Sequence, residues 1–201
     1  MPMIKAIIVD VDGVIRHIDI EIAEELAQSI GFSFSNLMNT LWDNDYGRQL
    51  LCGKITRSDW WKGIISLNSQ LSQIPQDFVW TEVFDKSSID WELVAYIRKV
   101  GQSRITAILT NCDSESKSLL LDELNTDHPF DYVISSSDVG AVKPEKGIYL
   151  ALLQKVGIEA DQCMFFDDSV RNVESARDLG IEAFVYKGLD HLRKMVESFQ
   201  E

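Results

Sequence analysis

The sequence lacks long hydrophobic runs, paired cysteines and a hydrophobic leader. No stretch approaches the roughly 18 to 20 apolar residues of a transmembrane helix, and the amino terminus has no signal-peptide pattern. Its three cysteines (Cys52, Cys112 and Cys163) form neither a CxxC pair nor a zinc-ligand spacing. We therefore expect a cytoplasmic protein, outside any membrane, whose reduced cysteines are packed as small hydrophobic residues.

Basic residues are also scarce. The chain has 19 lysines and arginines against 32 acidic residues, which gives a formal net charge of −13. Nucleic-acid binding requires a basic face, so this balance disfavours a nucleic-acid partner. A small phosphorylated metabolite is still an acceptable partner, because a bound cation can reverse the sign of the local field. The sequence leaves the oligomeric state open.

The sequence does contain a repeated alternation of strand-like and helical segments. Its 201 residues, 45% of them hydrophobic, suit one globular domain or a core with a smaller insertion. Apolar runs predict strands at Ile4–Val9, Ile105–Thr110, Tyr132–Ser135, Met164–Phe166 and Ala183–Tyr186. Helical spacing predicts helices at Ser114–Leu124, Pro144–Val156 and Ser169–Leu179. This alternation predicts a Rossmann-like α/β fold with a parallel sheet.

Two of these helices carry start signals. Pro144 suits the first turn of its helix, and Ser169 is expected to cap the next one. The apolar face of that second helix would comprise Val170, Val173, Ala176 and Leu179.

Residues 16–86 show a different pattern. They have helical periodicity at Glu21–Ile30, Ser58–Leu67 and Pro75–Phe84, and no convincing strand. We expect residues 1–15 and 87–201 to form the α/β core, and residues 16–86 to form a helical cap inserted after the first strand. With hinges beside the first strand and near Phe84–Ser88, such a cap is placed to cover the carboxyl edge of the sheet.

Polar residues cluster where the predicted strands end, which is where open parallel sheets bind ligands. They are Asp10, Asp12 and Gly13, then Thr110 and Asn111, then Lys143 ahead of Pro144, and finally Asp167 and Asp168. Residues two apart on a strand share a face, so Asp10 and Asp12 are expected to crowd each other. Carboxylates that close require a cation or a proton between them. An oxygen-rich cluster of this kind suits Mg²⁺.

Each motif alone has a commoner explanation. Asp-x-Asp-Gly also occurs in calcium loops, and Thr110-Asn111 suits a strand end followed by a turn. Lys143-Pro144 suits a surface lysine before a helix, and Asp-Asp-Ser suits a helix cap. Their joint order favours one phosphoryl-binding site over four unrelated features.

The motifs "DVDGV", "LTN", "KP" and "FFDDS" together resemble the haloacid dehalogenase superfamily over essentially the whole chain. The insertion resembles the helical cap that one large subclass carries after the first motif. The stretch from Lys143 to Tyr186 is similar to bacterial sugar-phosphate phosphatases and to the phosphatase domain of soluble epoxide hydrolases. The resemblance implies a Mg²⁺-dependent hydrolase of small phosphate monoesters. Sugar phosphates are the first expectation, ahead of nucleotide monophosphates and phosphoglycolate.

The resemblance also implies catalytic roles. Asp10 would attack phosphorus and form an aspartyl-phosphate. Asp12 would exchange protons with the leaving alcohol and with water. The hydroxyl of Thr110 and the amide of Asn111 would hold phosphoryl oxygens, and Lys143 would neutralise charge there.

Metal binding is implied for a second set of residues. The expected ligands of Mg²⁺ are Asp10, the backbone carbonyl of Asp12, and Asp168. Asp167 would act through water or orient Lys143. Gly13 would let the backbone leave the strand sharply beside the phosphate.

Other functions remain open at this stage. A 2-haloacid dehalogenase would use Asp10 against carbon, but halide release needs neither an acid nor a metal, so Asp12 and Asp168 favour phosphorus. A phosphomutase shares all of the motifs. A non-catalytic phosphate-responsive module, such as a response-regulator receiver, would carry its acidic pair at the first strand. Here the acidic pair follows Lys143 instead.

Several further residues are weaker candidates for substrate contacts. His17 either faces the pocket or occupies a solvated linker, the commoner case, and His128 and His191 are expected at the surface. Arg48 is a candidate for a second substrate charge. Cap aromatics are more often core than ligand contacts; they are Trp42, Tyr46, Trp60 and Trp61.

Overall fold

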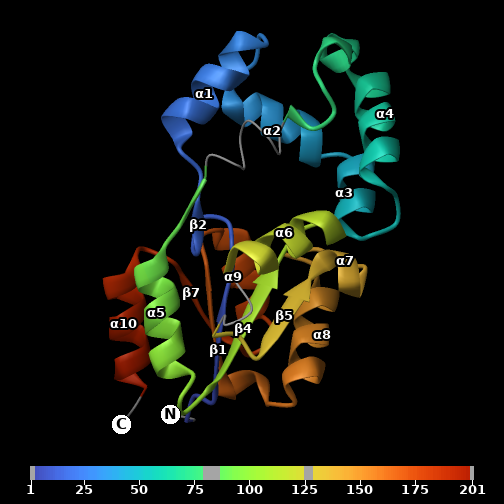
Figure 1. Ribbon diagram of the computed structural model, residues 1–201. Coiled ribbons are helices and arrows are strands. Elements are labelled where there is room, and N and C mark those ends of the chain that lie inside the picture. The colour runs from blue at the N-terminus through green and yellow to red at the C-terminus, as the bar shows by residue number, and fades with distance from the viewer. Residues whose placement is uncertain (1–2, 79–86, 125–128, 200–201) are drawn as a thin grey trace.

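The computed structural model describes residues 3–78, 87–124 and 129–199 of the chain (Figure 1). Its central element is a five-stranded sheet of order β5-β4-β1-β6-β7, in which every neighbouring pair is parallel. The strands are β1 (Ala6–Val9), β4 (Ile105–Thr110), β5 (Tyr132–Ser135), β6 (Cys163–Asp167) and β7 (Glu182–Val185). The predicted Rossmann-like α/β fold is confirmed, and each predicted strand is present with its ends shifted by two residues at most.

The first strand lies at the centre of the sheet. All residues of β1 are buried, because the strand pairs with β4 on one side and with β6 on the other. Val9 stands opposite Ile108 of β4 and Phe166 of β6. The residues that follow these three strands therefore emerge side by side at one edge.

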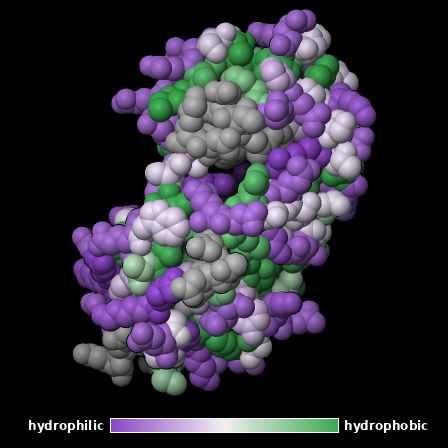
Figure 2. All heavy atoms as spheres, viewed as in Figure 1, coloured by the Kyte–Doolittle hydropathy of each residue, from purple (hydrophilic) through white to green (hydrophobic). Residues whose placement is uncertain are grey.

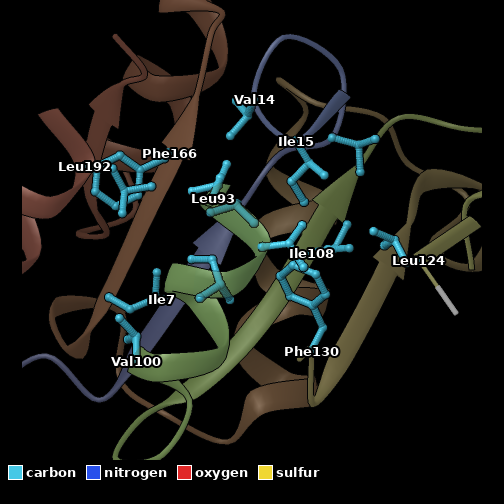
Figure 3. Close-up of a cluster of buried hydrophobic side chains, with 14 of the residues drawn as sticks. Ile7, Val14, Ile15, Leu93, Val100, Ile108, Leu124, Phe130, Phe166 and Leu192 are labelled. Carbon is cyan, nitrogen blue, oxygen red and sulfur yellow. The ribbon is translucent and has the colours of Figure 1, made fainter. Parts of the chain in front are cut away.

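Helices cover both faces of the sheet. They are α5 (Trp91–Val100), α6 (Ser114–Leu124), α8 (Lys146–Val156), α9 (Val170–Arg177) and α10 (Leu189–Ser198), with the short α7 (Ser136–Val139) and η3 (Ala160–Gln162) between strands and helices. On one face, α5, α6 and α10 contribute to a cluster that includes Leu93, Ile108 and Phe166 (Figure 3). On the other face, α8 and α9 pack around the buried Tyr149 and Phe165. Burying each such side chain stabilises the fold by roughly 1.5 to 3 kcal/mol. Because helices cover both faces of the sheet, a site can form only at the ends of the strands.

The helices of the expected cap pack together above the carboxyl edge of the sheet (Figure 1). They are α1 (Ile20–Ser29), α2 (Phe34–Trp42), α3 (Asp45–Leu51), α4 (Arg57–Leu67) and η1 (Ser69–Gln73). The predicted helices Glu21–Ile30 and Ser58–Leu67 correspond to α1 and α4 within one residue. Of the predicted helix Pro75–Phe84, residues 76–77 form a turn, and residues 79–84 lie outside the described residues.

Local capping explains where the cap helices begin. The side chains of Asp19, Ser33, Asn44 and Thr56 each accept hydrogen bonds from backbone N–H groups in the first turn of the helix that follows. Such bonds satisfy N–H groups that have no partner within the helix. The sequence pattern did not resolve α2 and α3, since nine and seven residues are too few to show a clear period.

A short antiparallel pair joins the cap to the core. Strands β2 (Arg16–His17) and β3 (Ser88–Ile89) pair with each other. The prediction of no strand within residues 16–86 was therefore wrong at Arg16 and His17. A two-residue strand has no periodicity and depends on a partner more than 70 residues away, which explains the miss. The helix after β3 begins at Trp91, with Asp90 accepting from Leu93 N–H as its cap.

Two helix starts differ from the prediction. Helix α8 begins at Lys146, after Pro144 rather than with it. Ser169 precedes α9 but makes no side-chain capping bond; instead its N–H donates to Oδ1 of Asp167. Val170 is 55% exposed and is not part of the buried face, which contains Val173 and Ala176. The helix α10 had no predicted counterpart.

Two compositional expectations concern cysteine and membranes. Cys52, Cys112 and Cys163 are all buried and unbridged, as predicted. Among the described residues, no helix combines the length and the apolar character that crossing a membrane would require.

Candidate active site

The predicted motif residues meet in one cavity at the carboxyl ends of the strands. Its volume is about 440 Å³, and in Figure 2 the surface is hollowed between the two lobes and bordered by hydrophilic residues. The lining residues are Asp10, Asp12, Gly13, His17, Ile18, Ile20, Thr110, Asn111, Lys143, Asp168 and Asn172. The structure thus brings together almost all of the expected set; only Asp167 lies beneath the surface of the cavity.

Lys143 links two carboxylates at the floor of this cavity. Its Nζ lies 2.7 Å from Oδ1 of Asp10 and 2.7 Å from Oδ2 of Asp167. All three side chains are at most 10% exposed. Burial lowers the pKa of Lys143, but the charges of Asp10 and Asp167 more than reverse this effect, so the net pKa is raised. Lys143 therefore remains an ammonium that compensates both carboxylates.

Asp10 follows β1 directly. Its Oδ1 also accepts from the N–H of Val11 at 2.7 Å. Burial raises the pKa of Asp10, Lys143 lowers it, and Asp167 raises it again, with a net rise. Asp10 is thus an oriented carboxylate whose charge depends on the cation beside it.

Asp167 serves as an internal support. In addition to Lys143, it accepts from the backbone N–H of Ser169 at 2.8 Å and from Nδ2 of Asn172 at 2.9 and 3.1 Å. These contacts fix the carboxylate at the start of α9 and leave it fully enclosed. Orientation of Lys143, one of the two roles expected for Asp167, agrees with this arrangement.

Three carboxylates are close enough to share a cation. One oxygen each from Asp10, Asp167 and Asp168 lies within 4.8 Å of the others. Burial and the charge of Asp167 raise the pKa of Asp168. Gly13 stands next to Asp168, where a Cβ would come within 2.3 Å of Oδ2, and its φ is +81°. Only glycine lets the backbone pass this close to the carboxylate.

Asp12 has a partner that the sequence did not predict. Its Oδ1 accepts from Nε of Arg16 at 2.7 Å. Strand β1 ends at Val9, so Asp10 and Asp12 are not on one regular strand. The charge of Asp12 contributes to raising the pKa of Asp10, and the carboxylates that converge within 4.8 Å are those of Asp10, Asp167 and Asp168.

Thr110 and Asn111 end β4, but their side chains differ in role. Thr110 is 2% exposed and lines the cavity beside Asp10. The amide of Asn111 bonds instead to the backbone of Lys143, donating to its carbonyl at 3.0 Å and accepting from its N–H at 2.8 Å. Asn111 also lines the cavity, and contact of its amide with phosphoryl oxygens stays a prediction. Asn111 braces the segment that carries Lys143.

The cap aromatics separate into two groups. Trp60 and Trp61 are 0% and 7% exposed and belong to the cap core, as does Tyr46, whose ring packs against Gly63. Trp42 stacks on Trp60 at 5.2 Å between ring centroids. It also lines two further cavities that adjoin the main one, of about 190 and 600 Å³. Trp42 is thus the cap aromatic placed to meet a substrate.

Two arginines of the cap bridge to the core. Arg48 pairs with Glu145 through two bonds of 2.8 and 3.0 Å and lines the cavity of about 600 Å³; its contact with a second substrate charge stays a prediction. Arg57 pairs with Asp113 through bonds of 3.0 and 3.2 Å and also donates to Ser116. Sequence reasoning missed this second bridge, because no local pattern relates residues 56 apart.

The histidines differ from one another. His17 is exposed on β2 and also lines the cavity, so both alternatives considered for it hold. His191 was expected at the surface but is half-buried, with an Nδ1 that has no hydrogen-bond partner among the described residues. His128 lies outside the described residues.

Sequence reasoning did not single out Asn172, whose side chain donates to Asp167. Its position near the start of α9, five residues after Asp167, was a signal that could have identified it.

Comparison with known protein families gives a match over most of the chain. A family model described as haloacid dehalogenase-like hydrolase matches residues 4–180. The parallel sheet and the order of the motifs along the chain agree with this class of protein. The chain belongs to the haloacid dehalogenase-like hydrolase family.

Curated relatives include hydrolases of two kinds. Rat bifunctional epoxide hydrolase 2 is 30% identical over 149 residues, which is 66% of this chain and 26% of the relative. The fructose-1-phosphate phosphatase YqaB of Escherichia coli is 30% identical over 91 residues, 45% of this chain and 48% of that protein. The chain therefore spans about a quarter of the length of the first relative.

Solved structures resemble the chain over nearly its whole length. A HAD family enzyme from Bacteroides thetaiotaomicron, in complex with magnesium and inorganic phosphate, has a TM-score of 0.75 at 21% identity, covering 94% of this chain and 98% of that one. An L-2-haloacid dehalogenase from Xanthobacter autotrophicus has a TM-score of 0.63 at 16% identity, covering 98% and 83%. At these identities the likenesses show the fold.

Proposed function

We propose that this chain is a Mg²⁺-dependent phosphatase of small phosphate monoesters, with sugar phosphates as its substrate class. The observation that carries the proposal is the contact between Lys143 and Asp10 at the floor of the cavity, where Asp167 also pairs with Lys143. A carboxylate held in this way is oriented for attack, and the ammonium can offset charge on a phosphoryl group. Relatives named as phosphatases, including the fructose-1-phosphate phosphatase, support both parts of the proposal.

Asp10 is the proposed nucleophile. The contacts from Val11 and Lys143 engage its Oδ1, so we assign Oδ2 to the attack on phosphorus. As the Oδ2–phosphorus bond forms, the bond to the leaving oxygen breaks and Asp12 gives that oxygen a proton. Asp12 then takes a proton from water, whose oxygen attacks phosphorus and releases Asp10 as a carboxylate.

Thr110 and Lys143 are the proposed contacts of the phosphoryl group. Both line the cavity next to Asp10, where a hydroxyl and an ammonium can donate to phosphoryl oxygens as charge develops. Asn111 acts one step further away, through the backbone of Lys143.

The donor set fits Mg²⁺, because the ion prefers oxygen ligands and three carboxylates converge here. We propose Asp10, the backbone carbonyl of Asp12, and Asp168 as its ligands. We propose that Asp167 does not ligate the ion directly, since both of its oxygens already accept hydrogen bonds. When bound, the ion would supply positive charge that offsets the carboxylates and the phosphate dianion.

Residues 16–86 are the proposed cap over this site. The cavities beside Trp42 lie between cap and core residues, which is where the leaving group of a phosphoryl group bound at Asp10 would extend. We propose that the cap recognises this variable part of the ester, and that closure excludes water from the site.

A panel of phosphate esters and 2-haloacids, assayed with Mg²⁺ and with excess EDTA, tests the proposal. We expect hydrolysis of sugar phosphates in Mg²⁺, loss of activity in EDTA, and recovery when Mg²⁺ is restored. Release of halide in EDTA would establish the dehalogenase alternative in its place. Transfer of phosphate within a sugar, without net release, would establish a mutase.

A further inference from the structure

The ion pair between Arg16 and Asp12 has no role in the mechanism proposed above. Nε of Arg16 lies 2.7 Å from Oδ1 of Asp12, and the arginine side chain is only 12% exposed. We propose that Arg16 is a positioning residue that holds the Asp12 carboxylate on the leaving-group side of the site. This inference rests on the proposed function, because Arg16 acts through Asp12.

The position of Asp12 supports this role. Its carboxylate is not one of the three that lie within 4.8 Å of one another, which are those of Asp10, Asp167 and Asp168. It borders both the main cavity and the adjoining cavity of about 190 Å³, which Trp42 also lines. In-line displacement puts the leaving oxygen on the side of phosphorus away from the nucleophile. A proton donor must therefore face the cavity rather than join the metal-binding carboxylates.

Arg16 supplies the restraint that keeps Asp12 there. Among the described residues, Arg16 is the only one whose side chain hydrogen-bonds to the Asp12 carboxylate. Without that bond the carboxylate would be drawn toward the cation site and toward Lys143, where it could not reach the leaving oxygen. Only Oδ1 is engaged by Nε, so the other oxygen can exchange a proton.

The backbone fixes Arg16 on two sides. Its N–H donates to the carbonyl of Val11, and its carbonyl accepts from the N–H of Gly13, both at 2.8 Å. It also pairs with Ile89 across the β2·β3 pair that connects the cap to the core. The backbone of Arg16 is thus fixed to the turn that carries Asp12 and to the β2·β3 pair, which limits where its guanidinium can lie.

The test compares two esters in the variant Arg16→Gln. A p-nitrophenyl ester leaves without protonation, whereas an alkyl ester such as glycerol phosphate needs a proton donor. We expect kcat for the alkyl ester to fall by roughly tenfold or more, with kcat for the p-nitrophenyl ester within about threefold of wild type and KM little changed for both. An equal fall for both esters would overturn the inference, because it would show a merely structural role.

Further variants separate the inference from the proposed function. Asp12→Asn should show the same dependence on the leaving group, more strongly; if it does not, the proton-transfer role of Asp12 fails and the inference fails with it. If Asp12→Asn shows the dependence and Arg16→Gln does not, the inference alone is wrong. Arg193→Gln, which removes an arginine paired with Glu92 and Asp190, is the matched control and should leave both rates unchanged.

Arg16→Lys covers the case in which the glutamine variant does not fold. It keeps the charge but loses the planar fork of donors. We expect a smaller loss that is again confined to the alkyl ester, and wild-type rates on both esters would contradict the need for Nε. Circular dichroism and thermal unfolding of each variant confirm that folded protein is compared.

Discussion

The ammonium nitrogen of Lys143 lies 2.7 Å from Oδ1 of Asp10, in a pair that is 1% and 10% exposed. Buried charges are stable only when each one is compensated, and Lys143 compensates Asp10 and Asp167 together. Asn111 adds a constraint by bonding to the backbone of Lys143 on both its N–H and its carbonyl. Segments from β1, β4 and β6 and from the loop before α8 therefore hold one charge arrangement.

Asp10→Asn is expected to abolish turnover while the fold is retained. The amide has nearly the same shape but cannot attack phosphorus. Steady-state assays on the best ester should give less than a tenth of wild-type activity, a loss of at least ~1.4 kcal/mol in transition-state stabilisation. Asp122→Asn, on the exposed face of α6, is the matched control and should be unaffected. More than a tenth of wild-type activity in Asp10→Asn would refute the nucleophile assignment.

Asp167→Ala and Asp168→Ala should fail in different ways. Asp167→Ala removes a fully buried partner of Lys143, so it should lower the free energy of unfolding by about 3 kcal/mol or more. Asp168→Ala should leave stability closer to wild type but raise the Mg²⁺ concentration needed for activity. Urea unfolding and Mg²⁺ titration of both variants measure these effects. A larger increase in Mg²⁺ requirement for Asp167→Ala would reverse the two roles.

Trp42→Ala and Thr110→Val should differ in selectivity. Thr110 lines the cavity where we propose that the phosphoryl group shared by all substrates binds, so its loss should depress every ester by a common factor. Trp42 lines the cavities on the cap side, so its loss should change the relative rates among esters. Rate profiles over about a dozen esters decide the matter. If Trp42→Ala lowers the rates of all esters by one common factor, the cap has only a structural role. Substitution of Tyr46, which packs inside the cap, is expected to affect stability.

The bridge between Arg57 and Asp113 should make stability depend on pH. Burial raises the pKa of Asp113, but hydrogen bonds from Arg57 and Ser116 more than reverse this, so its pKa lies below the ordinary value of 3.8. A carboxyl with a lowered folded-state pKa stabilises the fold above its unfolded pKa, and that contribution is lost as pH falls through the folded pKa.

Asp113→Asn should therefore destabilise the protein by about 1 to 3 kcal/mol near neutral pH. The difference from wild type should shrink as pH falls below about 4. Urea unfolding at neutral and acid pH measures it, with Asp122→Asn as a control that has no such partner among the described hydrogen bonds and ion pairs. A difference that stays constant with pH would contradict the role of this ion pair.

Local sequence patterns determined much of the fold. Apolar runs located all five strands of the parallel sheet, because buried parallel strands are continuously hydrophobic. Since the carboxyl ends of such strands meet at one edge, the order of Asp10, Thr110, Lys143 and Asp168 along the chain already implied a shared site. The family resemblance gave orientation of Lys143 as one of the two roles expected for Asp167.

Tertiary structure alone decided which partner each side chain takes. Asn111 bonds to Lys143 across 32 residues, Arg57 to Asp113 across 56, and Arg48 to Glu145 across 97. Asp12 accepts a hydrogen bond from Arg16, which is only four residues away. This contact was not predictable, because β1 ends at Val9 and the backbone then departs from strand geometry. The spacing of residues predicts a face only while the chain stays regular. Beyond the last regular residue, the contacts follow from the path of the whole chain.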